Sequence, residues 1–244
     1  MPLASLIKGQ EIEDLPGMVR YYKVQMVKGG VKVHTGVEFT PALADQIKPD
    51  AIIVATGGAL AIPSIKGIDK PIVLTTPALH KKAKPFLKLF GPVALSKLTK
   101  IWLPVGKNVV VIGTGLHGTE IGEFLTKRGR KVTLVDIADV PGEGTIEANF
   151  GMLKEWFDSK GVKLINGAKS IEITDTGVQY VDKDGGKVTL PADTVIPTRP
   201  LAASLDLFNK LKDKAPEVYA VGDCMEPKMI VDAVGTGFST AREI

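Results

Sequence analysis

The feature that most constrains this chain is the run VVVIGTGLHG at residues 109–118, where four β-branched residues lead into the spacing G-x-G-x-x-G. A buried strand, a glycine turn and a helix start in this order form the unit that holds a dinucleotide pyrophosphate. Gly113 permits a tight turn, Gly115 lets backbone N–H groups approach the phosphates, and Gly118 lets the next helix pack against the strand. Unpaired N–H groups at the helix start would bind the anion. The predicted phosphate-binding residues are Gly113, Thr114, Gly115, Leu116, His117 and Gly118.

The residues that follow agree with this interpretation. Residues 119–128 have helical apolar spacing, Gly129 fits a C-terminal cap, and residues 131–135 form a second apolar strand. Asp136 ends that strand about 20 residues after the glycines, where an adenosine ribose hydroxyl would lie. The alternative is a parallel α/β unit whose glycines serve only packing. The complete order of strand, turn, helix, cap and acidic strand end favours the nucleotide interpretation.

Asp136 also predicts which nucleotide is preferred. Its carboxylate can accept hydrogen bonds from the ribose of NADH, whereas the 2′-phosphate of NADPH would bring like charge close to it. Residues 137–139 contain no arginine, and Asp139 adds negative charge. We therefore expect NADH to be preferred by about 1 to 3 kcal/mol.

Composition limits the other functions. The chain has 244 residues, 44% of them apolar, and a single cysteine, Cys224. One cysteine excludes an internal disulfide, a C-x-x-C redox pair and a cysteine-ligated cluster, and we expect Cys224 to be a small buried hydrophobe. The histidines lack ligand spacing, so we expect no metal site. No run approaches a membrane span and the first residues do not resemble a secretory signal, so we expect a cytoplasmic protein.

The positive charge of the chain is concentrated in one segment. Residues 70–119 contain eight lysines and no acidic residue, while the net charge of the whole chain is +4. Apolar residues recur at helical spacing over 79–90 and again over 93–102, and we expect a break at Gly91-Pro92. This helical insertion, residues 77–103, either covers its own domain or docks on an acidic partner or an anionic membrane. We favour the covering role, and expect no contact with a membrane surface or with nucleic acid.

Two more strand ends have the composition of cofactor contacts. Residues 51–54 are an apolar strand that runs into Ala55-Thr56-Gly57-Gly58, and residues 31–35 before it look β-like. Residues 217–221 form a strand that stops at Gly222-Asp223, and a helical pattern follows at 229–244. Asp223 could accept a hydrogen bond from a ligand hydroxyl. Each strand end alone fits a simple turn equally well.

In this order, A-T-G-G (55–58), G-x-G-x-x-G with Asp136, and V-G-D (221–223) resemble the flavoprotein reductases with two dinucleotide domains. Residues 15–36 and 221–244 resemble more closely the C-terminal region of the 2,4-dienoyl-CoA reductase, 2-enoate reductase and NADH:flavin oxidoreductase group, multidomain relatives of Old Yellow Enzyme. The resemblance implies FAD contacts at Ala55, Thr56, Gly57, Gly222 and Asp223, and an NAD(P)H side formed by the glycine motif with Glu120 and Asp136.

The chain also departs from that family. There, a first glycine motif for the ADP half of FAD lies upstream of the segment matching residues 3–9, and a flavin barrel with iron–sulfur cysteines precedes it. Residues 195–200 replace a second A-x-G strand end. We expect a fragment or reduced version of a larger oxidoreductase, which binds NAD, retains little FAD alone, and works with an upstream flavin and iron–sulfur barrel domain or a partner protein.

The predicted fold is α/β with two Rossmann-like dinucleotide-binding units. A NAD-binding domain at residues 105–200 would be inserted into an incomplete FAD-type domain at residues 1–104 and 201–244. Within the NAD-binding domain we expect strands at 109–112, 131–135 and 162–165, a helix at 147–160 and a hairpin over 171–190.

The predicted function is the NADH-binding, electron-transfer portion of an FAD-dependent oxidoreductase. Hydride would pass from NADH to flavin and on to a partner domain. The cofactors would supply the chemistry, so we assign no catalytic side chain and expect the isolated chain to be inactive. The alternative is a non-catalytic nucleotide-binding or interaction module.

Overall fold

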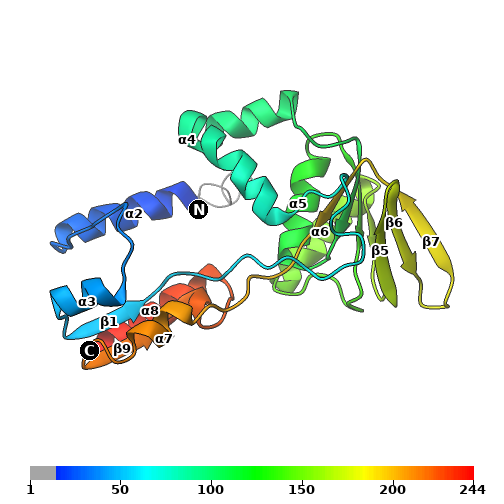
Figure 1. Ribbon diagram of the computed structural model, residues 1–244. Coiled ribbons are helices and arrows are strands. Elements are labelled where there is room, and N and C mark those ends of the chain that lie inside the picture. The colour runs from blue at the N-terminus through cyan, green and yellow to red at the C-terminus, as the bar shows by residue number, and fades with distance from the viewer. Residues whose placement is uncertain (1–14) are drawn as a thin grey trace. The chain divides into compact units, whose positions relative to one another are not determined.

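A computed structural model describes residues 15–244, apart from the side chains at positions 15, 16, 80, 83 and 91–93. The chain divides into two compact units (Figure 1). The larger unit comprises Met1–Val31, of which residues 15–31 are described, and Ile62–Arg199; the smaller unit comprises Lys32–Ala61 and Pro200–Ile244. The first described helix is α2, Leu15–Lys28.

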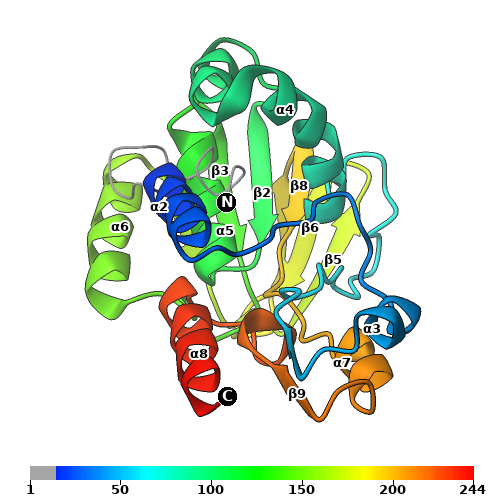
Figure 2. The same ribbon diagram turned by 90° about the vertical axis from the view of Figure 1, so that its left-hand side faces the viewer.

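The larger unit is built on a four-stranded parallel sheet in the order β4-β3-β2-β8, part of which is seen in Figure 2. The strands are β2 (Asn108–Ile112), β3 (Lys131–Val135), β4 (Lys163–Ile165) and β8 (Thr194–Pro197). Successive side chains of a strand point to opposite faces, and here both faces are buried. Val109 and Val111 therefore join one core cluster, and Val110 and Ile112 join another.

Helices cover one face of this sheet and a second sheet covers the other (Figure 1). The helical side includes α5 (Leu116–Thr126) and α6 (Glu147–Ser159), which bury Leu125 and Phe157 against Leu134. The opposite side is an antiparallel sheet of β5 (Ser170–Thr174), β6 (Gly177–Val181) and β7 (Lys187–Pro191). The predicted hairpin over 171–190 is thus three strands with two turns.

The basic insertion forms one helix, α4 (Thr76–Ile101), so the predicted break at Gly91-Pro92 is wrong. Figure 1 shows α4 bent into two arms. A proline in a helix lacks the N–H for one backbone bond, which bends the helix without necessarily ending it. Leu79, Leu87 and Leu95 pack into the helical-side core, as a covering helix would. This packing places residues 62–104 in the larger unit, whereas the sequence suggested that they belong with the flavin-type segments.

The smaller unit contains a parallel pair of strands, β1 (Ala51–Val54) and β9 (Glu217–Ala220). Around them lie α3 (Pro41–Ile47), α7 (Asp206–Leu211), the short 3-10 helix η1 (Gly222–Cys224) and α8 (Ile230–Glu243). Its core comprises Ala44, Ile52, Val54, Leu211 and Cys224, which confirms the buried position of Cys224. Residues 31–35 are not a strand: Val31 and Val33 are exposed, and a β-like pattern without a neighbouring strand does not form a sheet.

Candidate functional site

The glycine turn after β2 is too tightly packed for side chains at two of its positions. Gly113 has φ +118°, and a Cβ there would lie 2.2 Å from Oγ1 of Thr198. A Cβ at Gly118 would lie 2.0 Å from the carbonyl oxygen of Gly113. The α5 backbone therefore approaches the strand end as closely as the sequence motif requires.

The start of α5 presents several backbone N–H groups. The first bond back from the helix is donated by Thr119 N–H to the Gly115 carbonyl, at 3.0 Å. Within the described part of the chain, the N–H groups of Gly115, His117 and Gly118 have no hydrogen-bond acceptor. Free N–H groups at a helix start, with the positive end of the helix dipole, favour an anion such as a phosphate.

The loop after β3 lies against the same turn. Gly142 N–H donates to the Thr114 carbonyl at 2.8 Å, and Leu116 N–H donates to the Glu143 carbonyl at 2.9 Å. A Cβ at Gly115 would lie 3.1 Å from that Glu143 oxygen, so Gly115 serves the approach of this loop as well. No local sequence pattern predicts these contacts, because they join segments almost thirty residues apart.

Asp136 directly follows β3 and is bonded to the glycine turn. Its Oδ2 accepts hydrogen bonds from the Thr114 N–H at 2.7 Å and the Thr114 hydroxyl at 3.2 Å, and its Oδ1 accepts one from the Ala138 N–H at 3.2 Å. A carboxylate offers about four acceptor positions. Asp136, which is half-buried, therefore orders the turn and keeps an acceptor position for a ligand hydroxyl.

Two further side chains support the turn and were missed by the sequence reasoning. Asn166 follows β4 and donates from Nδ2 to the Thr114 hydroxyl at 2.8 Å and to the Ala138 carbonyl at 3.0 Å. Thr198 follows β8 and donates from Oγ1 to the Ile112 carbonyl at 2.9 Å. Both stand at carboxyl ends of strands beside β2 and β3, a placement that requires the strand order.

The structure brings the predicted nucleotide residues together in the larger unit. The glycine motif and Asp136 are linked through Thr114, which is fully buried. Glu120 lies half-buried on α5. The predicted flavin residues form a separate group in the smaller unit, namely Ala55, Thr56, Gly57, Gly222 and Asp223.

That second group gathers at one edge of the β1–β9 pair. Parallel neighbours end at the same edge, and the Val221 N–H extends the ladder by donating to the Val54 carbonyl at 3.0 Å. A Cβ at Gly58 would lie 3.4 Å from the Asp223 carbonyl oxygen. The Gly222 N–H already donates to Oγ1 of Thr236 at 3.0 Å, whereas Asp223 accepts only a long bond, 3.4 Å, from the Lys228 N–H.

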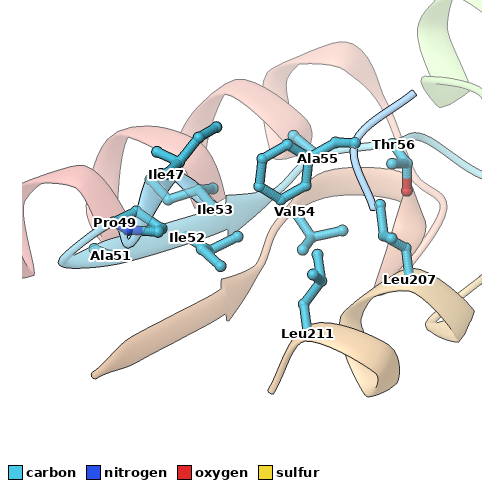
Figure 3. Close-up of a pocket in the computed structure, with 11 residues that line it drawn as sticks. Ile47, Pro49, Ala51, Ile52, Ile53, Val54, Ala55, Thr56, Leu207 and Leu211 are labelled. Carbon is cyan, nitrogen blue, oxygen red and sulfur yellow. The ribbon is translucent and has the colours of Figure 1, made fainter. Parts of the chain in front are cut away.

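A groove of about 410 Å³ runs beside β1 in the smaller unit (Figure 3). Of the residues that line it, Thr56 has the only polar side chain; Figure 3 shows Ile52, Val54 and Leu211 among the apolar ones. Such a surface suits apolar side chains from another segment better than a phosphate. In the described part of the chain no three acidic, histidine or cysteine residues are grouped to hold a metal ion, and none of its helices is both long and apolar enough to cross a membrane.

Known proteins are similar to this chain in sequence and in fold. Over 92% of this chain, an NADH oxidase from Thermoanaerobacter brockii is 29% identical and a bilirubin reductase from Mediterraneibacter gnavus is 30% identical. A 2-naphthoyl-CoA reductase structure matches 99% of the chain with a TM-score of 0.79 and 25% identity. The chain spans about a third of the length of each: 32% of the two curated relatives and 34% of the solved chain. Residues 11–198 match the family described as pyridine nucleotide-disulphide oxidoreductase, and the chain belongs to that family.

Proposed function

We propose that this chain is the NADH-binding, electron-transfer portion of a larger FAD-dependent oxidoreductase. The observation that carries the proposal is the start of α5, where three backbone N–H groups have no protein acceptor. The neighbouring Thr114 N–H donates to the carboxylate of Asp136, which holds Asp136 next to these groups. The family assignment supports it, as do relatives named NADH oxidase and bilirubin reductase. NADH supplies a hydride when bound, and this chain positions it.

The roles divide between two parts of the site. The N–H groups of Gly115, His117 and Gly118 would hold the pyrophosphate, and Gly113 shapes the turn. Asp136 would accept a hydrogen bond from the adenosine ribose, while Thr114, Leu116 and Glu120 complete the nucleotide side. In domain terms we assign the NAD-binding role to residues 105–200, with α4 packed on them.

For FAD we propose the edge formed by Ala55, Thr56, Gly57, Gly222 and Asp223. Asp223 is the member suited to a flavin hydroxyl, because its carboxylate has one long hydrogen bond and is half-buried. The apolar groove beside β1 fits a further segment of a multidomain enzyme, either an upstream flavin-type domain or a partner protein. The relatives are about three times as long as this chain, which accommodates such a domain.

The deciding experiment is calorimetric titration with NADH and NADPH. We expect the wild-type chain to prefer NADH by about 1 to 3 kcal/mol, and Asp136→Ala to weaken NADH binding and narrow the gap to NADPH. Asp184→Ala, at an exposed position in the turn between β6 and β7 of the same unit, is the matched control and should keep the preference. Equal or tighter binding of NADPH by the wild type would refute the assignment.

A second candidate is a nucleotide-binding module without turnover, favoured by the two-stranded sheet of the smaller unit. We expect the purified chain to carry little FAD and to show no steady oxidation of NADH with a dye acceptor. Stoichiometric flavin absorbance would contradict the first expectation. Turnover restored by the rest of the enzyme would favour the electron-transfer role; NADH binding without any such turnover would favour the module.

A further inference from the structure

The outward surface of α4 combines lysines with exposed apolar side chains. We call these exposed lysines and apolar residues, which are named at the end of this paragraph, the α4 surface. Lysine is the only charged residue type in residues 70–119, and the segment contains no arginine, aspartate or glutamate. The exposed lysines of the α4 surface are Lys81, Lys82, Lys84, Lys88, Lys97 and Lys100, and its exposed apolar residues are Phe86, Leu89, Phe90, Leu98, Ile101 and Trp102.

The orientation of the second arm is fixed by Arg128 of the loop after α5. Its Nε donates to the Thr99 hydroxyl at 3.0 Å, and one terminal nitrogen donates to the Ser96 carbonyl at 3.3 Å. The guanidinium also stacks on the ring of Phe124, 3.4 Å from the centroid. With Leu95 buried beside these contacts, the inner face of the arm is already occupied.

The apolar residues left outside are therefore not the covering face of the helix. Ile101 is 87% exposed, Trp102 63% and Leu98 39%, and on the first arm Leu89 is 75% exposed. Single exposed apolar residues are common, but α4 and its C-cap residue Trp102 carry six of them, interspersed with six exposed lysines. Lysines together with Trp, Phe and Leu at a helix surface are the composition of helices that lie in a membrane interface.

We propose that the α4 surface docks this protein on an anionic lipid bilayer. A basic surface made of lysine alone favours a lipid surface over an acidic protein, because arginine suits paired hydrogen bonds to carboxylates whereas lysine acts as a flexible point charge. Lysine stems can also lie along apolar surface while the ammonium groups reach lipid headgroups. Phe86, Phe90 and Trp102 would enter the headgroup boundary. This role adds to the covering role that the inner face performs, and is independent of the proposed function.

The first test is sedimentation with vesicles of phosphatidylcholine and phosphatidylglycerol, against pure phosphatidylcholine. We expect binding to the anionic vesicles only, weakened by salt. Replacing Lys81, Lys82, Lys84 and Lys88 together with glutamine should reduce partitioning at least about tenfold. The matched control replaces four exposed lysines of the same unit with glutamine, Lys160, Lys163, Lys169 and Lys187, and should bind as the wild type does. Unchanged melting temperatures show that both variants are folded.

The second test follows Trp102, which can be isolated because the chain has two tryptophans. In a Trp156→Phe background its emission should shift to the blue on anionic vesicles, and Ile101→Ser should reduce both the shift and the partitioning. No binding to anionic vesicles, or equal loss in both lysine variants, would overturn the proposal. So would unchanged Trp102 emission with equally tight binding to soluble polyglutamate, the result expected for an acidic protein partner.

Discussion

The two compact units differ in how completely they bury their own apolar residues. In the larger unit both faces of the β2-centred sheet are covered, and Val111 and Leu134 are fully buried. In the smaller unit a two-stranded sheet and a core cluster of five buried residues must suffice. A pair of strands is marginally stable by itself. The larger unit therefore resembles a finished domain, whereas the smaller unit has apolar surface still available for contact.

The helix α8 shows this difference most directly. Its apolar residues Ile230, Val234 and Phe238 recur at helical spacing, yet all three are exposed and α8 buries no residue. A periodic apolar stripe of this kind normally faces a core. The pattern thus predicts that a helix forms, but a stripe alone does not say which segment covers it.

The largest expected effects compare the two cores directly. Leu134 and Leu211 are both fully buried, in the larger and smaller unit respectively. Each change to alanine should cost about 2 to 5 kcal/mol of unfolding free energy. Leu211→Ala should increase hydrogen exchange in the smaller unit and leave NADH binding intact. Leu134→Ala should increase hydrogen exchange in the larger unit and weaken NADH binding. Loss of NADH binding in Leu211→Ala would show that the units are not separately stable.

The next effect concerns the glycine turn. Gly118→Ala places a methyl group against the Gly113 carbonyl, and we expect about 3 kcal/mol of lost NADH affinity, roughly a hundredfold. Gly151 on α6 is the matched control, since a Cβ there meets nothing within 4 Å. Gly151→Ala should instead stabilise the chain by about 0.5 to 1 kcal/mol. Thermal melts and NADH titrations of both variants check this, and normal NADH affinity in Gly118→Ala would contradict the close approach.

Arg128 provides an intermediate effect. Burial lowers its pKa to about 10, so the folded state disfavours the charged form, and that cost is constant below the lowered pKa. Stability should rise only as the pH is raised above about 10, where the folded state has lost the proton and the unfolded state still holds it. Arg128→Lys keeps the charge but loses the fork to Ser96 and Thr99, and should cost about 1 to 2 kcal/mol.

The control for Arg128 lies in the other unit. Arg242 on α8 is exposed and stands 5.6 Å from the Phe238 ring, so Arg242→Lys should change stability by less than about 0.5 kcal/mol. Chemical denaturation of the two Arg→Lys variants measures the difference. Equal effects would mean that α4 gains nothing from the Arg128 contacts.

The smallest expected effect is at Asp193, before β8. Its Oδ2 accepts hydrogen bonds from the N–H of Asn108 at 2.8 Å and from the Asn108 side chain, and these lower the pKa of the carboxyl below 3.8. A lowered folded pKa stabilises the fold above the unfolded value, and this stabilisation is lost as the pH falls through the folded value. Asp193→Asn should therefore show a slightly flatter loss of stability below pH 4, measured by urea denaturation. If Asp193→Asn and the wild type lose stability identically below pH 4, the hydrogen bonds between Asn108 and Asp193 do not stabilise the fold.

The local structure of the candidate site could be predicted from sequence where one segment contains the whole signal. Residues 109–118 specify strand, turn and helix locally. The strands predicted at 109–112 and 131–135 are confirmed as β2 and β3. Asn166 and Thr198 could not be found in this way, because they reach the turn only through the order of β4, β3, β2 and β8. The predicted strand at residues 31–35 was wrong for the opposite reason: the local pattern is β-like, but no neighbouring strand pairs with these residues.

The close approach of Gly118 to the Gly113 carbonyl also limits how such a protein can evolve. No substitution at Gly118 avoids that oxygen, so descendants cannot adjust the turn itself by small steps. Residues 137 and 139 are exposed and carry no such restriction. For the proposed function, a lineage that changes its nucleotide would therefore accumulate differences at the end of β3 while its glycines stay the same.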